Sequence, residues 1–260
     1  MGSWKLNKMI VAELSHNHQG DLSLLKEMIA AAAQAGVQAV KIQTHYAKDL
    51  STGWLKERKE HVEAYELSEQ AHHLFSMWCG EYGVQPVTSV YTDRYCEMLK
   101  GNGITTLKLG SAECQDQRLM QSLIQKDFVV WASSGGHDIG SLKFPDQIGV
   151  IMHCRSIYPH PPNQAGMLRM KALQERFPQR VGYSSHVDPT HPEWMQPIRI
   201  AALMGAAWIE VHFTLKPRRE TKDGAVSLDF NQLKEVCDFC RVDESKTERD
   251  LIAHYKTRWK

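Results

Sequence analysis

Two histidines in the last third of the chain, His186 and His212, each follow a strand-like segment. Residues 180–184 and 207–213 are rich in β-formers, and residues 193–205 between them carry apolar side chains at helical spacing. Strands joined through a helix run parallel with a right-handed crossover, so their carboxyl ends emerge on one side of the sheet. We therefore expect both imidazoles at one opening, as candidate ligands of a divalent metal ion. The alternative is that each is an ordinary core or surface histidine.

Charged residues also occur near the carboxyl ends of other strand-like segments. Period-two alternation puts Glu13, Lys41, Lys108 and Glu210 on the strand faces that would turn inward in a barrel. Buried ions without partners are strongly destabilising, so these side chains must compensate one another or bind a charged ligand. A buried network, for instance Glu13 with Lys41, is the structural alternative. We favour a catalytic pocket because so many polar groups share one end of the fold.

The residue types indicate what such a pocket binds. The two lysines together with Ser111, Ser133 and Ser184 suit a ligand that carries a phosphate and a carboxylate. Two histidines leave several positions of a divalent ion open for water and substrate oxygen. Because a tightly held ion normally has a third protein ligand, we expect a loosely held Mn²⁺ or Mg²⁺ and not structural zinc. Asp223, in a glycine-flanked loop, adds a nearby carboxylate.

The remaining histidines and the cysteines carry weaker signals. His16 and His18 could be ligands, but we expect them to be loop-forming surface residues. His72 and His73 fall on a helical pattern that we expect to be solvated. The six cysteines are scattered apart from a C-x-x-C pair at residues 237–240, which without a second pair indicates ordinary packing.

Strand and helix patterns alternate along the chain. Eight strand-like segments occur, at residues 9–14, 39–44, 85–90, 105–109, 128–132, 150–154, 180–184 and 207–213. Helical patterns occur at residues 22–35, 67–82, 92–100, 119–125, 165–176, 193–205 and 228–241. A length of 260 residues is typical of one eight-fold α/β barrel. We therefore predict an α/β fold, a single (β/α)8 TIM barrel, with residues 1–260 forming one catalytic domain.

Two connecting segments could cover the open end of this barrel. Residues 47–66 form a charged connector without an assigned element, and residues 187–194 lie between the two metal-ligand candidates. Either segment could be a lid, or both could be solvated surface.

The overall composition excludes several classes of partner. The chain has 31 basic and 30 acidic residues, so no global field favours nucleic acid or an anionic membrane. No apolar run reaches the length of about 18 residues that a membrane span needs. The N-terminus lacks the long hydrophobic segment of a signal peptide. We expect a cytoplasmic protein with no nucleic acid and no membrane partner.

Several motifs together resemble the sialic acid synthase (N-acetylneuraminate synthase) family. The segment VAELSHNHQGD is similar to the family's AEIGxNHxGD, AVKIQT to AVKFQT, and LKLGSAEC to YKIASGEC. Further on, HCRSIYPHP is similar to HCTxxYPxP, GYSSH to GxSDH, and IEVHFTL with the later KDG to IEKHFTL and GPD. These matches run in one order from Val11 to about Leu233, and their combination is highly specific.

The resemblance implies a barrel enzyme that condenses phosphoenolpyruvate with an aldehyde sugar, typically N-acetylmannosamine or its 6-phosphate. The product is a 2-keto-3-deoxy acid, and phosphate is released. By this resemblance His186 and His212 would hold the divalent ion. Phosphoenolpyruvate would be bound by Lys41, Lys108, Ser111, Ser133 and Ser184, with Tyr158 at its edge. The sugar and the metal-bound water would be faced by Gln43 and by the catalytic carboxylates Glu13, Glu113 and Asp223, of which Glu13 would orient or deprotonate the water.

Three departures from the family pattern bear on the acceptor sugar. Ser185 stands where the family has aspartate before the metal histidine, and Ser156 stands where it has asparagine before the tyrosine. We expect the resemblance to cover the barrel only, without the family's C-terminal antifreeze-like domain, which brings an arginine into a partner's site. We therefore expect an acceptor other than N-acetylmannosamine itself.

The sequence leaves open both what covers the site and which function the barrel performs. The site would be covered by the chain's own loops, by the partner in a homodimer or by a separate protein. The competing functions are a metal-dependent pyruvate aldolase or lyase and a non-catalytic barrel that binds a sugar phosphate.

Overall fold

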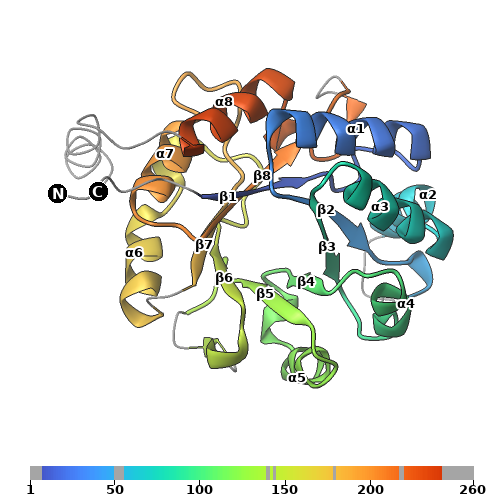
Figure 1. Cartoon of the computed structure of the whole chain (residues 1–260). Coiled ribbons are helices and arrows are strands. Elements are labelled where there is room, and N and C mark those ends of the chain that lie inside the picture. The colour runs from blue at the N-terminus through green and yellow to red at the C-terminus, as the bar shows by residue number, and fades with distance from the viewer. Residues whose placement is uncertain are drawn as a thin grey trace.

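Eight parallel strands close into a barrel, because β1 (Met9–Glu13) pairs with β8 (Trp208–Phe213) as well as with β2 (Ala39–Thr44) (Figure 1). The computed structural model describes residues 8–49, 56–138, 141–142, 145–177, 180–216 and 220–241. The other strands are β3 (Gln85–Val90), β4 (Thr106–Leu109), β5 (Val129–Ser133), β6 (Val150–His153) and β7 (Val181–Ser185). The predicted single (β/α)8 TIM barrel is confirmed.

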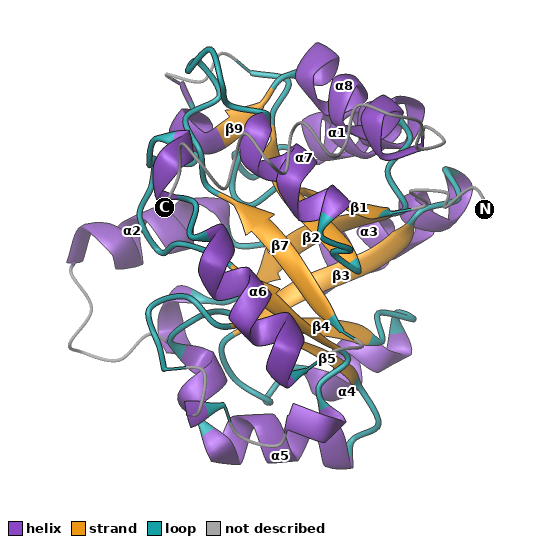
Figure 2. Cartoon of the chain, turned by 90° about the vertical axis from the view of Figure 1, so that its left-hand side faces the viewer, coloured by secondary structure: helices purple, strands orange, loops and turns teal. Residues whose placement is uncertain are grey.

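Helices surround this barrel on the outside, as Figures 1 and 2 show. They are α1 (Leu22–Ala35), α2 (Lys56–Tyr65), α3 (Glu69–Glu81), α4 (Cys96–Gly101), α5 (Gln117–Gln125), α6 (Met167–Arg176), α7 (Gln196–Leu203) and α8 (Phe230–Arg241). Short 3-10 helices occupy Ala47–Asp49, Glu113–Gln115, Pro145–Gln147, Pro162–Gln164 and Gly224–Val226. No helix among the described residues is long and apolar enough to cross a membrane.

The predicted boundaries agree closely where the end of an element has a clear chemical signal. Asp21 caps α1 by accepting hydrogen bonds from the backbone N–H groups of Ser23 and Leu24. Gly36 ends that helix in the left-handed conformation, at φ 103°. Where such signals are weak the prediction is less accurate, and α4 begins at Cys96 although a helix from residue 92 was expected.

Some elements were not predicted, among them α2 and a short ninth strand. The connector at residues 47–66 contains a 3-10 helix and α2, and residues 50–55 lie outside the described part of the chain. α2 is polar, but its Val62 is buried, which fixes one side of the helix against the protein. The short strand β9 (Ser227–Leu228) lies beside the carboxyl end of β8 and pairs in parallel with His212 and Phe213.

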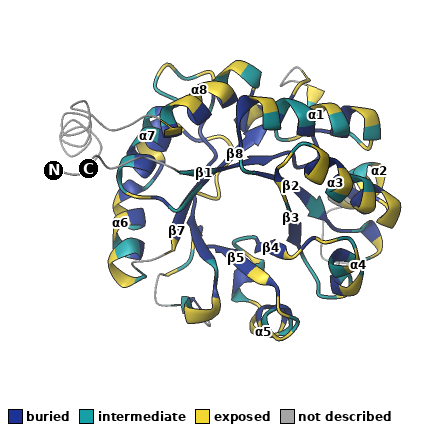
Figure 3. Cartoon of the chain, viewed as in Figure 1, coloured by how far each residue is buried: buried dark blue, intermediate teal, exposed yellow. Residues whose placement is uncertain are grey.

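The barrel strands are buried on both faces, whereas the helices are exposed on their outer sides (Figure 3). The larger core fills the space between strands and helices. A second apolar cluster lies inside the barrel and is made by Val11, Ala39, Val87, Trp131, Val150 and Met152, with Trp208 packed against it. The Trp131 and Trp208 rings lie 4.7 Å apart between centroids. This inner cluster leaves the carboxyl-terminal half of the barrel for polar residues.

The expectation for His72 was wrong. Its side chain is fully buried under α3, where Nδ1 donates to the Ser68 carbonyl and Nε2 lies 2.8 Å from Thr44 Oγ1. Because a carbonyl can only accept, Nε2 is left to accept the Thr44 hydroxyl proton. His73, by contrast, is exposed as predicted.

Candidate active site

The inward positions of the strands change from apolar to polar toward their carboxyl ends. On β1 the inner cluster residue Val11 is followed two positions later by Glu13, and on β2 Ala39 is followed by Lys41 and then Gln43. The same step occurs from Val87 to Ser89, from Trp131 to Ser133 and from Trp208 to Glu210 and His212. Period-two alternation therefore stacks a ring of polar side chains directly on the apolar floor.

Two lysines and two carboxylates form a buried ion-pair network in this ring. Lys41 is in direct contact with the Glu13 carboxylate, and its Nζ donates to Ser89 Oγ at 2.9 Å. Lys108 Nζ lies 2.5 Å from Glu210 Oε1, and Lys41 Nζ lies 3.8 Å from the same oxygen. The buried ion-pair network that the sequence offered as an alternative to a catalytic pocket is thus present. A pocket is present as well, because the network borders a cavity.

The electrostatics of the network follow from its burial. Burial opposes the ionisation of Glu210, but Lys108 and Lys41 outweigh this effect and hold its pKa at about 2. Burial lowers the pKa of Lys41, and the positive charge of Lys108 acts in the same direction while Glu210 opposes both. Glu210 also accepts a hydrogen bond from Ser184 Oγ at 3.0 Å. Glu210 is therefore a fixed anion that serves three side chains from three other strands.

The two predicted metal ligands face each other, with ring centroids 5.5 Å apart. Burial and the neighbouring His212 hold the pKa of His186 well below its usual value. Its Nδ1 donates to the Arg155 carbonyl at 2.6 Å, which leaves the lone pair on Nε2. The Tyr158 hydroxyl lies 2.7 Å from that Nε2 and the two rings stack. His186 is therefore neutral, with its tautomer fixed as a metal-binding histidine requires.

His212 is also neutral and has an unusual surrounding. Burial lowers its pKa, although Asp223 and Glu210 act in the opposite direction. Its buried Nδ1 has no hydrogen-bond partner among the described residues, and the Asp223 carboxylate lies 3.9 Å away. Asp223 contacts the hydroxyl of Ser15, which also accepts from Gln43 Nε2 at 3.0 Å. Ser15 adopts a positive φ of 46°, which is uncommon for serine and places its hydroxyl in this cluster.

Two cavities open above the ion-pair network. The inner cavity measures about 110 Å³ and is lined by Glu13, Lys41, Gln43, Ser89, Tyr91, Lys108, Gly110, Ser111, Ser133, Cys154, Tyr158, His186, Glu210 and His212. The outer cavity measures about 470 Å³ and is lined by Ser15, His16, Gln43, His45, His61, Val62, Tyr91, Tyr158, His212, Lys222 and Asp223. Because Gln43, Tyr91, Tyr158 and His212 line both, the two cavities adjoin.

A serine corner forms part of the inner cavity. Ser111 Oγ lies 3.2 Å from Ser156 Oγ and 3.6 Å from Cys154 Sγ. A Cβ atom at Gly135 would lie 2.6 Å from Ser111 Oγ and 2.8 Å from Cys154 Sγ. Only glycine at position 135 therefore lets these side chains meet.

Most predicted site residues come together in these cavities, and two stand apart. Ser184 lies behind the cavity as a hydrogen-bond partner of Glu210. Glu113 lies on the 3-10 helix after β4 and is not among the residues that line the two cavities. Its carboxylate packs against the backbone of Gly110, where a Cβ atom would lie 2.5 Å from Glu113 Oε2.

Several lining residues were not predicted. Ser89 occupies an inward position two residues after Val87, so the period of β3 could have identified it. His16 and His18 were expected at the surface, but both are buried. His16 contacts His45 and His61, which come from separate elements. No local pattern joins these three histidines, because they lie in three separate parts of the chain that only the tertiary structure brings together.

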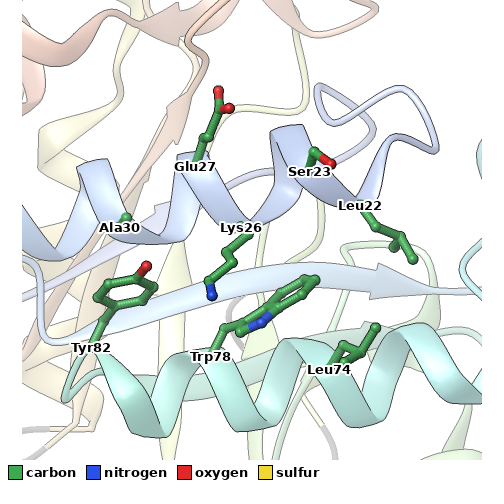
Figure 4. A pocket seen from close by; sticks show the side chains of 8 residues that line it. All are labelled: Leu22, Ser23, Lys26, Glu27, Ala30, Leu74, Trp78 and Tyr82. Atoms are coloured by element: carbon green, nitrogen blue, oxygen red, sulfur yellow. The ribbon is translucent and has the colours of Figure 1, made fainter.

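A further hollow lies on the outside of the barrel between α1 and α3 (Figure 4). It measures about 400 Å³, and its side chains include Leu22, Leu74 and Trp78, with Lys26 Nζ 5.7 Å from the Trp78 ring centroid. Lys26 also pairs with the exposed Glu81. This hollow contains no set of groups suited to catalysis, so the candidate active site is the polar end of the barrel.

The cysteines take no part in metal or disulfide chemistry among the described residues. All six are free and buried. Burial raises the pKa of Cys237 and of Cys240 to about 12, so both thiols stay protonated. The interpretation of this pair as ordinary packing agrees with that environment.

The chain is similar to known proteins over most of its length. A model of the NeuB family matches residues 28–249. N,N'-diacetyllegionaminic acid synthase from Legionella pneumophila is 28% identical over 266 residues, which cover 91% of this chain and 72% of that protein. Pseudaminic acid synthase from Campylobacter jejuni is 28% identical over 270 residues, which cover 94% of this chain and 77% of that protein.

A solved structure gives an independent view of the fold. N-acetylneuraminic acid synthetase from Leptospira borgpetersenii superposes with a TM-score of 0.82 at 21% identity, covering 97% of this chain and 93% of that one. At this identity the likeness concerns the barrel architecture alone.

We predict that Glu210→Gln lowers the free energy of unfolding by roughly 3–5 kcal/mol, because it leaves buried lysines without their carboxylate. Urea denaturation monitored by circular dichroism measures this change. Since the folded pKa of Glu210, about 2, lies below its ordinary value of 4.5, the stabilisation is present above that value and is lost as the pH falls from 4.5 toward 2. The difference in the free energy of unfolding between Glu210→Gln and the unaltered protein should therefore become smaller as the pH falls.

Glu235→Gln is the matched control for this measurement. Glu235 pairs with Arg199 at 3.2 Å, but its side chain is half exposed, so its loss should change stability by less than about 1 kcal/mol. Equal effects of the two substitutions would contradict the assignment of Glu210 as the central anion.

Proposed function

Because the chain belongs to the NeuB family, we propose that it is a carbon–carbon bond-forming sugar acid synthase that uses phosphoenolpyruvate. Its second substrate is an aldose, and its product is a 2-keto-3-deoxy sugar acid. The observation that carries the proposal is the pair Lys41 and Lys108, both held at the floor of a cavity by Glu13 and Glu210. Named relatives that make legionaminic and pseudaminic acids support the same class of product.

The inner cavity is suited to phosphoenolpyruvate. Lys41 and Lys108 offer positive charge, and Ser111 and Ser133 offer hydroxyl groups along the same wall. Charge-assisted hydrogen bonds from lysine to phosphate are stronger than neutral ones, above all in a site that excludes water. Tyr158 lines both cavities and marks the edge of this subsite.

A divalent ion, Mn²⁺ or Mg²⁺, fits the two neutral histidines. The fixed tautomer of His186 and the buried Nδ1 of His212 without a hydrogen-bond partner among the described residues both suit metal binding. No group of three His, Cys, Asp or Glu side chains within the described ranges is placed to hold a metal, so the remaining ligands would be water and substrate. Because the Tyr158 hydroxyl contacts His186 Nε2, it would have to turn away before that nitrogen could bind the ion. When bound, the ion would polarise the aldehyde oxygen and add the positive charge that the balanced ion-pair network lacks.

The side chains suggest how the reaction proceeds. C3 of phosphoenolpyruvate bonds to the aldehyde carbon, water adds at C2, and the C2–O bond to phosphate breaks. The water oxygen becomes the C2 carbonyl and the water gives up both protons, one to the aldehyde oxygen and one to the departing phosphate, so no redox partner is needed. Glu13, which lines the inner cavity, would orient or deprotonate the water, and Gln43 and Asp223, which line the outer cavity, would face the sugar. Glu113 would act through the Gly110 backbone that it supports and not by direct contact.

Release of inorganic phosphate from phosphoenolpyruvate in the presence of a panel of aldoses tests the proposed function. We expect aldose-dependent release with Mn²⁺, with products of matching mass, and a better acceptor than free N-acetylmannosamine in the panel. A pyruvate aldolase or lyase would instead use pyruvate and release no phosphate. Binding without turnover of any aldose would favour the non-catalytic barrel.

We expect Lys108→Ala to raise the KM for phosphoenolpyruvate roughly 10- to 100-fold, because a charge-assisted hydrogen bond contributes about 1.5–3 kcal/mol. The effect is measured by steady-state kinetics and by calorimetric binding of phosphoenolpyruvate. Lys126→Ala is the control, since Lys126 pairs with Asp93 at the surface. An unchanged affinity in Lys108→Ala would make this lysine a structural partner of Glu210 only.

We expect His186→Ala and His212→Ala each to abolish most activity and to weaken Mn²⁺ binding by roughly 10-fold or more, since even changes behind a metal ligand cost roughly 10- to 100-fold. Mn²⁺ titration followed by electron paramagnetic resonance measures binding independently of turnover. His73→Ala, on the exposed side of α3, should bind Mn²⁺ as the unaltered protein does. Wild-type turnover by either site variant in chelator-treated buffer would refute the metal assignment.

A further inference from the structure

Ser15 follows β1 in the left-handed backbone conformation, with φ at 46°. Among the other described residues that are not glycine, a positive φ occurs at Gln19 and Asp127. The left-handed region is unfavourable for residues that have a Cβ atom, whereas glycine adopts it readily. Such a conformation persists where the surrounding structure imposes it, often at a functional site. The Ser15 side chain is therefore a candidate for a role that glycine could not perform.

The backbone on both sides of Ser15 is anchored to neighbouring strands. Before it, the Leu14 N–H donates to the Lys41 carbonyl of β2 at 2.8 Å. After it, the buried Asn17 side chain donates to the Phe213 carbonyl at the end of β8 at 2.9 Å. The Asn17 N–H also donates to the Leu14 carbonyl at 2.9 Å. Ser15 therefore cannot leave the left-handed region without disturbing these hydrogen bonds.

The Ser15 hydroxyl connects two residues that line the outer cavity, Gln43 and Asp223. A carboxylate can only accept, so the hydroxyl donates its proton to Asp223. Its oxygen accepts from Gln43 Nε2 at 3.0 Å, and the Tyr91 hydroxyl donates to Gln43 Oε1 at 3.3 Å. If the amide were flipped, its oxygen would face a serine oxygen whose proton is already donated. The row of hydrogen bonds therefore fixes the orientation of the Gln43 amide.

This arrangement leaves one donor and one acceptor for a ligand. Among the described residues, neither the second N–H of Gln43 nor the second carboxylate oxygen of Asp223 makes a further hydrogen bond. Ser15 lies between these two side chains and sets their relative position. A hydroxyl group both accepts and donates, so it is complementary to such a pair. The pair is thus suited to the hydroxyl groups of a sugar.

We propose that Ser15 is a positioning residue, which holds the Gln43 amide and the Asp223 carboxylate as a donor–acceptor pair for hydroxyl groups of the acceptor aldose. This inference rests on the proposed function, because it assigns how the same site orients its second substrate. Ser15 acts through its two partners and keeps its left-handed backbone because its hydroxyl must lie between them. Glycine would fit the backbone without strain but would leave both partners without their common contact.

The backbone of Ser15 has a separate contact that the test must preserve. Its N–H donates to Glu13 Oε1 at 2.6 Å, and Glu13 is the carboxylate assigned to the water. Ser15→Ala and Ser15→Gly both keep this N–H and both lack the hydroxyl. They differ in how well they tolerate a positive φ, which is unfavourable for alanine and not for glycine. Comparison of the two variants therefore separates the strain of the backbone from the role of the hydroxyl.

Thermal unfolding of the full chain, followed by circular dichroism, measures the strain. Ser15→Gly should unfold at a temperature roughly 2–4 °C higher than Ser15→Ala. Asp127 is the matched control, because it has a φ of 57° and an exposed side chain, and it lines neither cavity. Asp127→Gly should likewise be more stable than Asp127→Ala, and neither should alter the kinetics. An equal or reversed order at Ser15 would contradict a strained backbone there.

Steady-state kinetics with phosphoenolpyruvate, Mn²⁺ and the aldose of the panel that is condensed fastest measure the positioning. Both Ser15 variants should raise the KM for the aldose roughly 10-fold, because the pair that binds it is no longer held in place. The KM for phosphoenolpyruvate should change less than about 2-fold, because the inner cavity keeps its side chains. A purely structural defect would instead lower kcat and leave both KM values unchanged.

Monodeoxy analogues of the same aldose show whether the effect concerns particular hydroxyl groups. Loss of a hydroxyl that the pair binds should lower kcat/KM by roughly 10-fold in the unaltered protein and by less than about 3-fold in Ser15→Ala. At the other positions of the sugar, loss of a hydroxyl should have the same effect in both proteins. Such selective coupling would not arise from a general loss of stability.

Two kinetic outcomes would overturn the inference while leaving the synthase intact: an unchanged KM for the aldose in both Ser15 variants, or equal discrimination against every deoxy analogue with and without the hydroxyl. If no aldose is condensed, the proposed function fails, and a crystal structure of Ser15→Ala still tests the positioning. A changed rotamer of Gln43 or Asp223 in that structure would support the positioning role. Both side chains in their present places would refute it.

Discussion

Burial of two lysine side chains at the centre of the barrel is the constraint on which the site depends. Lys41 and Lys108 lie on β2 and β4, and neither could remain charged there without a carboxylate in contact. Glu13 and Glu210 provide this contact from β1 and β8, while Ser89 and Ser184 satisfy further hydrogen bonds. The charges that suit the pocket to an anion thus also join four of the eight strands, and the hydrogen bonds of Ser89 and Ser184 add β3 and β7. A substitution at any of these charged residues is consequently expected to change both the stability of the fold and the binding of a ligand.

The apolar floor beneath the network determines where a ligand can lie. Trp131 and Trp208 pack against each other and fill the amino-terminal part of the barrel together with small and branched side chains. Any polar ligand is therefore confined to the carboxyl-terminal end, where the strand ends supply hydroxyls, imidazoles and ions. The same floor keeps water away from the lower side of the ion pairs, which strengthens their interaction with each other and with a bound anion.

The sequence predicts the parts of this protein that depend on short-range periodicity. Alternation along each strand was enough to place Glu13, Lys41, Lys108 and His212 inside the barrel. The helical pattern at residues 22–35 gave the bounds of α1, which Asp21 and Gly36 cap in the structure. Contacts between loops were not predictable in this way. His16 was expected at the surface, and His45 and His61 were not predicted to belong to the site, because their contacts join a loop after β1, a residue after β2 and α2. Ser15 needed a positive φ, which no residue-type pattern indicates for serine.

The division into two cavities separates two kinds of specificity. The inner cavity is built mainly from strand residues whose positions are set by the closed barrel, so its lining is difficult to alter without loss of the fold. The outer cavity takes its wall from loops and from α2, which lies on the side of the barrel toward which the strand arrows point in Figure 2. α2 reaches the cavity through His61 and Val62, so side chains there can change without disturbing the ion-pair network. In a barrel of this kind the side chains of the inner cavity can stay the same while changes in α2 alter which ligand the outer cavity accepts.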